Sequence, residues 1–151
     1  MSTPSSEQSD GITELLQEHQ EVKEAFQQLE RGLEPARRRD LLQSVAAALS
    51  RHTRTEERHL YPLVRKALLH GNDIADHEAR QHDEISRLLH LLRDMDDDDP
   101  HLQNRMLQLI SETLHHMHEE ESDLFPQLRA ECHQDELRSL GERVRAARGT
   151  V

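Results

Sequence analysis

Residues 116–126, HMHEEESDLFP, decide how this chain is expected to fold, because their pattern occurs twice. Sixty-four residues earlier, residues 52–62 read HTRTEERHLYP, and both segments fit the pattern H-x-x-x-E-E-x-x-L-(Y/F)-P. Positions four apart lie on one face of an α-helix, so the histidine and the first glutamate of each copy point in the same direction. The repeat therefore predicts two equivalent helices, each of which presents a His-Glu pair.

A second pair of histidines lies upstream of each copy. Apolar residues follow His19 at +3, +6, +7 and +10, and they follow His82 at the same offsets. These two histidines are 63 residues apart, so a single-residue loop difference reconciles the two halves of the chain. The residues that the repeat predicts on inward faces are His19, His52, Glu56, His82, His116 and Glu120.

Composition and charge restrict the fold and the partners. The chain has 151 residues, 34% of them hydrophobic, which suits one domain with a core of aliphatic side chains and favours helices over sheets. A formal net charge of -11 argues against nucleic acid and against an anionic membrane surface as partners. A single cysteine, Cys132, and the lack of an apolar N-terminal run indicate a cytoplasmic protein.

Helix signals predict an all-α fold, an antiparallel up-down-up-down four-helix bundle with a short C-terminal helix. Asp10 is a suitable N-cap and Gly32 a suitable end for the first helix, and the second starts near Pro35 and is kinked or ended by Pro62. Gly71 and Asn72 are interpreted as a loop. The expected organisation is a disordered leader at 1–9, the bundle at 10–132, and a C-terminal helix and tail at 133–151, with helices at about 73–94, 100–131 and 134–147.

The acidic run at 96–99 is interpreted as a solvated loop. Its last residue, Asp99, is expected to cap the fourth helix, which would begin at Pro100. A calcium loop would need a glycine for its turn, and this run contains none.

Six inward His and Glu groups predict a metal site. One inward histidine alone is more simply a core residue that is satisfied by a nearby acceptor, but six converging groups are not explained in that way. Two buried carboxylates that face each other raise the pKa of one of them unless a cation neutralises them. Nitrogen and oxygen ligands without thiolate favour iron, with manganese or zinc less favoured, and six ligands exceed the needs of one tetrahedral ion.

The repeated pattern, with an inward histidine on the helix before each copy, resembles the haemerythrin-like HHE cation-binding domain over about residues 10–130. That resemblance implies two iron ions with oxo or hydroxo and carboxylate bridges, and a diatomic gas or peroxide as the partner. Oxygen-carrying haemerythrins have a second histidine four residues before the third-helix histidine, whereas position 78 is Glu. Glu78 is either a seventh ligand or an acid that is hydrogen-bonded to a neighbouring histidine.

Other residues near the pattern have weaker signals. Glu57 and Glu121 recur in both copies and suit a supporting contact, and Tyr61 could reach a metal or donate a proton. His77 is five residues from His82, which rotates it off the inward face. The remaining histidines lack repeat partners and are interpreted as surface residues: His59, His70, His90, His101, His115, His118 and His133.

The leading functional hypothesis is a non-haem di-iron protein that binds or senses oxygen, nitric oxide or peroxide. Two alternatives remain open: a di-iron enzyme that turns over peroxide or nitric oxide, and a non-catalytic iron-storage, iron-donor or interaction protein. No catalytic residue beyond the ligands is recognisable, and a protein partner is unknown.

Overall fold

The computed structural model describes residues 9–149, and every regular element within that range is helical. The all-α class is therefore confirmed, whereas nearly all of the expected leader at 1–9 lies outside the described residues. No helix within the described range is long and apolar enough to cross a membrane. The elements are α1 (Gly11–Glu30), α2 (Pro35–Thr55), η2 (Glu56–Leu60), α3 (Tyr61–Ala67), α4 (Gly71–Asp94), α5 (Leu102–Glu119), η3 (Glu120–Leu124), α6 (Phe125–Glu131) and α7 (Gln134–Gly149).

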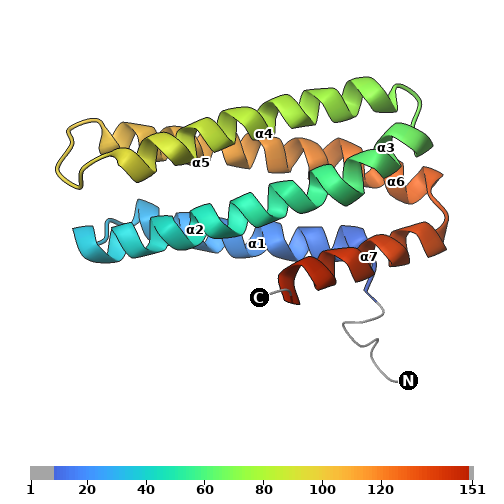
Figure 1. Cartoon of the computed structure of the whole chain (residues 1–151), viewed down its shortest axis with the longest axis horizontal. Helices are drawn as coiled ribbons and strands as arrows, with labels where there is room; N and C mark the ends of the chain where they lie inside the picture. Colours follow the sequence, from blue (N-terminus) through green and yellow to red (C-terminus); the bar gives the residue numbers. More distant parts are fainter. Residues whose placement is uncertain (1–8, 150–151) are drawn as a thin grey trace.

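Four long helical segments lie side by side along the molecule (Figure 1). They are α1, α2 continued through η2 into α3, α4, and α5 continued through η3 into α6. α1 contacts α2 and α5, and α4 contacts α2 and α5, so each segment has two neighbours around a shared interior. α7 lies outside this group and packs against α1.

The ends of α1 and the start of α2 follow the sequence signals. The Asp10 carboxylate accepts a hydrogen bond from the backbone N–H of Thr13 at 2.8 Å, as an N-cap does. Gly32 has a φ of 82°, a left-handed conformation that glycine adopts without steric cost, and α2 begins at Pro35. These three predictions are confirmed.

The predicted loop at Gly71 and Asn72 is wrong, because both residues lie in the first turn of α4. The chain turns before them, at His70, which has a φ of 61°. A Cβ on Gly71 would lie 2.2 Å from the carbonyl oxygen of Val64. Glycine is therefore needed here for a close approach between α3 and α4 and not for a turn.

The predicted start of the fourth helix at Pro100 is also displaced. α5 begins at Leu102, and the Asp99 carboxylate accepts a hydrogen bond from the backbone N–H of His101 at 2.8 Å. Asp99 thus stabilises the turn that precedes α5 and does not cap the first residue of the helix.

The two prolines of the repeat neither end nor break their helices; each follows a π-helical turn, η2 or η3. The backbone N–H of Tyr61 bonds to the carbonyl of Glu56, and that of Phe125 to the carbonyl of Glu120, both five residues back. A proline has no N–H to donate and its ring clashes with the carbonyl four residues before it, so a wider turn lets the helix continue past Pro62. The sequence marked the position but not the type of irregularity.

Buried polar groups separate two apolar clusters along the helices. One cluster includes Phe26, Leu49 and Leu109, and the other includes Leu15 and Leu60 together with residues of α7. Each fully buried large aliphatic or aromatic side chain contributes about 1.5–3 kcal/mol. The two clusters therefore provide the stability that holds a polar layer in the interior.

Candidate metal centre

The six residues predicted on inward faces meet in the polar layer, and each is at most 4% exposed. Ligand atoms of the first group lie within 4.8 Å of one another, and so do those of the second. Glu56 belongs to both groups. The first group is His19, His52, Glu56 and Glu120, and the second is Glu56, His82 and His116.

In the first group, imidazole and carboxylate atoms converge at short distances. His19 Nε2 lies 3.2 Å from Glu120 Oε1, and His52 Nε2 lies 3.3 Å from Glu56 Oε2. The two Nε2 atoms are themselves 3.2 Å apart. The α1 and α2 histidines thus present the same nitrogen to one small volume.

The second group repeats this arrangement on α4 and α5. The Nε2 atoms of His82 and His116 are 3.0 Å apart, and they lie 3.0 Å and 3.6 Å from Glu56 Oε1. His116 Nε2 also lies 3.5 Å from Glu120 Oε1. Glu56 and Glu120, the first glutamate of each copy, therefore lie between the two histidine pairs.

Carboxylates outside the centre hold the opposite nitrogen of the histidines in the first group. His19 Nδ1 lies 2.8 Å from Glu121 Oε2, and His52 Nδ1 lies 2.7 Å from Glu18 Oε1. An Nδ1–H that donates to a carboxylate leaves the Nε2 lone pair directed inward, which is the tautomer a metal requires. Glu121 was a predicted supporting residue, but Glu18 was missed.

The second group has related but unequal support. His116 Nδ1 lies 2.7 Å from Gln81 Oε1 and 2.8 Å from Glu78 Oε2, whereas His82 Nδ1 is 3.7 Å from Glu57 Oε1. Gln81 comes directly before His82, just as Glu18 comes directly before His19. This equivalence between the two halves is the sequence signal that could have revealed Glu18 and Gln81 as supporting residues. The structure places Glu78 beside the outer nitrogen of His116.

The two central glutamates have opposite pKa shifts. Burial alone would raise the pKa of Glu56, but the charge of His52 and the close imidazoles of His116 and His52 outweigh burial, so the pKa lies well below its ordinary value. Burial and the negative charge of Glu56 raise the pKa of Glu120. Without a cation, one carboxyl of the pair thus tends to hold a proton, as two facing buried acids do.

The pKa values of two buried imidazoles are raised, although burial alone would lower them. Burial lowers the pKa of His52, but the carboxylates of Glu56 and Glu18 outweigh burial and raise this pKa to about 10. In the same way, Glu120 and Glu56 outweigh burial and raise the pKa of His116 to about 11. The hydrogen bond with His19 lowers the pKa of Glu121 to about 2. Protonated imidazoles would thus supply the positive charge of an absent cation, and metal binding would release their protons.

Two carboxylate oxygens test whether the site fits a cation. Glu56 Oε2 and Glu120 Oε1 are buried and make no hydrogen bond with any atom that the structure describes. A buried carboxylate oxygen without a hydrogen bond is costly unless a charge compensates it. The donor set of imidazole nitrogens and carboxylate oxygens fits a metal ion such as iron or manganese.

The repeat differs at one position next to the centre, where Tyr61 in one copy corresponds to Phe125 in the other. The Tyr61 hydroxyl lies 2.9 Å from His82 Nε2 and 3.4–3.5 Å from carboxylate oxygens of Glu120 and Glu56. Burial and the nearby carboxylates raise its pKa, so the hydroxyl keeps its proton. Phe125 instead stacks on His19, with ring centroids 5.8 Å apart.

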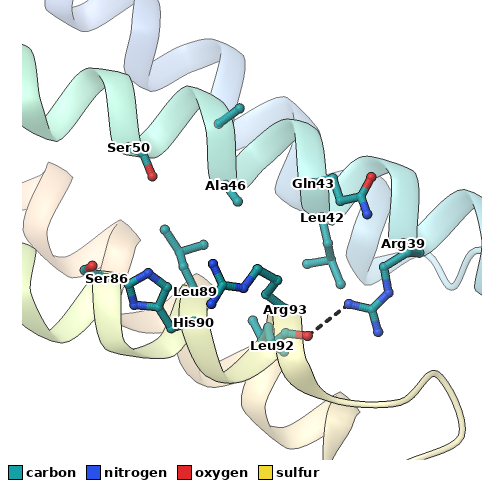
Figure 2. A pocket seen from close by; sticks show the side chains of 11 residues that line it. Arg39, Leu42, Gln43, Ala46, Ser50, Ser86, Leu89, His90, Leu92 and Arg93 are labelled. Atoms are coloured by element: carbon teal, nitrogen blue, oxygen red, sulfur yellow. Dashed lines mark hydrogen bonds between the residues drawn. The ribbon is translucent and has the colours of Figure 1, made fainter.

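Two cavities between neighbouring helices differ in whether they touch the His-Glu groups. Figure 2 shows a cavity of about 300 Å³ between α2 and α4, where Arg39 donates to the carbonyl of Leu92; no predicted ligand lines it. A smaller cavity of about 90 Å³, between α1 and α2, is lined by His52 and Glu18. Only the smaller of these two reaches the His-Glu groups.

Comparison with known proteins identifies the family. Residues 10–128 match the family described as Hemerythrin HHE cation binding domain. The chain belongs to the haemerythrin HHE family. For this haemerythrin-type chain, the family and the buried His-Glu groups together indicate a metal cation site.

A curated relative of this haemerythrin-type chain is a DNA nickase from Nostoc sp. (strain PCC 7120 / SAG 25.82 / UTEX 2576). The two are 24% identical over 134 residues, which is 89% of this chain and 38% of the relative. The chain thus spans less than two-fifths of the relative's length. No solved structure matches the chain.

Proposed function

We propose that this protein binds or senses oxygen, nitric oxide or peroxide at a carboxylate-bridged di-iron centre inside an antiparallel up-down-up-down bundle. In this proposal His19 and His52 hold one iron, His82 and His116 hold the other, and Glu56 and Glu120 bridge them. The position of Glu56 in both ligand groups is the observation that carries it. A carboxylate that belongs to two ligand groups suits a bridge between two ions, one on each side of it.

The chemistry of the donors favours iron, and manganese or zinc less. Four imidazoles and two carboxylates without thiolate are typical of non-haem iron, and Cys132 is not among the grouped residues. Iron in such a site supplies redox chemistry toward small oxygen- and nitrogen-containing molecules.

The chain's own residues orient and enclose the centre. Glu18 and Glu121 fix imidazole tautomers, which raises the basicity of the inward nitrogens. The apolar clusters on both sides exclude bulk water. The cavity of about 90 Å³ that His52 and Glu18 line is small and suits a diatomic or peroxide better than a larger substrate.

A second candidate is an enzyme that turns over peroxide or nitric oxide, and the Tyr61 hydroxyl favours it. This hydroxyl keeps its proton within hydrogen-bond distance of His82 and is the one candidate donor we identify beside the centre. Sustained turnover would support the enzyme, whereas a single stoichiometric reaction would support a sensor or carrier. An iron-storage or donor role would instead show readily exchanged iron and no reaction with diatomics.

DNA nicking is not proposed for this chain. The relative with that name is more than twice as long, and the net charge of -11 opposes binding to a phosphate backbone. Nucleic acid therefore stays outside the expected partners.

The test is metal content together with the visible spectrum. Protein purified from iron-supplemented cells should contain close to two irons per chain and a visible spectrum that changes on reduction and on exposure to oxygen, nitric oxide or peroxide. One zinc ion per chain, or colourless protein without metal, would contradict the proposal.

A further inference from the structure

The repeat places two equivalent grooves at the side of the bundle, one along α1 and η2 and one along α4 and η3. Helix α7 fills the first groove, and the second is open. In the first half, α7 covers the surface of α1 and η2. A Cβ on Gly11 would lie 2.2 Å from Leu140 Cγ, so the fit of α7 in this groove is tight. The equivalent position in the second half is Ile74, on α4, where an open cavity of about 400 Å³ is found instead.

The filled groove is closed to cations by charge. Arg145 and Arg148 of α7 form ion pairs with Glu14, and Arg148 Nε lies 3.5 Å from Glu18 Oε2. Arg148 thus lies beside the carboxylate that supports His52, and Arg145 lies beside Glu14, four residues earlier on α1. A metal ion approaching from this side would meet positive charge.

The open cavity has the opposite character. His77 Nε2 lies 3.1 Å from Glu119 Oε2, and atoms of these two residues and Glu78 lie within 4.8 Å of one another. No lysine or arginine lines the cavity. Its lining residues are Asp73, Ile74, His77, Glu78, Glu119, Asp123, Leu124 and Gln127.

Glu78 connects this cavity to the buried centre. It is 4% exposed and lines the cavity, yet its Oε2 makes no hydrogen bond within the described chain, although it lies 2.8 Å from His116 Nδ1. The single Nδ1 proton of His116 has Gln81 Oε1 as its acceptor at 2.7 Å. The imidazole of His116 pairs with one side of this buried carboxylate, and a cation in the cavity would stabilise it from the other side.

We propose that His77, Glu78 and Glu119 form a second divalent-cation site at the edge of the bundle, through which Fe²⁺ reaches the buried centre. His77 and Glu119 capture the ion from solvent, and Glu78 holds it next to His116. The loading role rests on the proposed di-iron function, whereas binding of an ion at this second site does not. Acidic walls raise the local concentration of a cation and speed its capture.

The test compares iron loading in two matched double variants of the full chain. Metal-free protein is mixed with Fe²⁺ without oxygen, and protein-bound iron is measured over time after rapid passage through a chelating column. H77A/E119Q should load about tenfold more slowly than the unmodified protein and reach the same final iron content. H90A/E112Q removes the same residue types from exposed sites on α4 and α5, and it should load at the unmodified rate.

Two further measurements keep the outcomes separate. H77A alone changes a half-exposed side chain and should also slow loading, which guards against an indirect effect of Glu119 on Gln81. Mn²⁺ binding, followed by EPR, should show one ion fewer in H77A/E119Q than in H90A/E112Q. Equal loading rates or equal Mn²⁺ counts in the two double variants would overturn the inference. Unmodified protein that takes up no iron would instead overturn the proposed function, and the Mn²⁺ count would still decide the second site.

Discussion

At the scale of single residues, position relative to the centre separates side chains of the same type. Glu56 lies between both histidine pairs, whereas Glu121, also a motif glutamate, contacts the outer nitrogen of His19 and the ammonium group of Lys23. The same chemical group therefore serves either as a bridge or as a support, depending on which side of an imidazole it occupies.

Replacement of these two glutamates should have different consequences. E56Q removes a charge shared by both ligand groups and should lower the bound iron well below two per chain. E121Q should keep the full iron content under saturating iron but weaken affinity by about 10–100-fold, as loss of a supporting carboxylate does. Iron quantification and competition with a chelator measure both effects; equal losses in the two variants would contradict this division.

Tyr61 gives a second prediction at this scale. Y61F gives the first copy of the repeat the same aromatic residue as Phe125 in the second, so packing is kept and only the hydroxyl is lost. Bound iron should stay the same, and the rate of reaction with peroxide should fall. The rate is followed by stopped-flow absorbance. An unchanged rate would exclude a proton-donating or ligand-orienting role for the hydroxyl.

At the scale of elements, the π-helical turns place residues that a regular helix would turn away. In an α-helix, a residue five positions on is rotated by about 140° from the first. η2 is wider, and the Tyr61 hydroxyl comes within 3.5 Å of Glu56 Oε1. The irregular turn therefore brings the His-Glu pair and the aromatic residue to the same centre.

The docking of α7 gives a prediction about stability. A Cβ on Gly141 would lie 2.3 Å from the backbone carbonyl oxygen of Ser9, so G141A should cost about 1–3 kcal/mol by overpacking. A loss of that size lowers the melting temperature by roughly 2–4 °C per kcal/mol in a chain of this length.

G149A is the matched control, because nothing lies within 4 Å of a Cβ at that glycine. Its melting temperature should stay within about a degree of the unmodified protein or rise slightly, since alanine favours helix more than glycine does. Equal destabilisation by both substitutions would show that α7 does not pack as described. Thermal denaturation followed by circular dichroism measures both.

At the scale of the whole molecule, the polar layer links metal binding to folding. Glu56 and Glu120 are fully buried and face each other between two apolar clusters. Removal of the cation leaves one oxygen of each, Glu56 Oε2 and Glu120 Oε1, without a hydrogen bond, at a cost of several kcal/mol that protonation only partly relieves.

Chelation should therefore lower stability. With free metal at about 100 times the dissociation constant, one ion contributes about 2.7 kcal/mol, which corresponds to a fall of roughly 5–10 °C in the melting temperature on its removal. Calorimetry of metal-loaded and chelated protein measures this. A melting temperature that does not change would count against a buried metal centre.

The sequence predicted much of the interior but less of its surroundings. The repeat identified which six side chains come together, and Asp10 and Gly32 marked the ends of α1, because these signals depend on local helix geometry. Glu18 and Gln81 were missed, since their roles arise from contacts between helices and their residue types differ. The sequence also did not predict which groove α7 fills, because hydrophobic periodicity does not indicate which face of the bundle a fifth helix covers.

The most direct test of a shared two-ion centre is the EPR spectrum of the oxidised protein, with iron quantified in the same sample. Two irons bridged by Glu56 and Glu120 couple their spins, so we expect about two irons per chain and almost no high-spin ferric signal. A strong mononuclear ferric signal that accounts for the bound iron would contradict the shared centre.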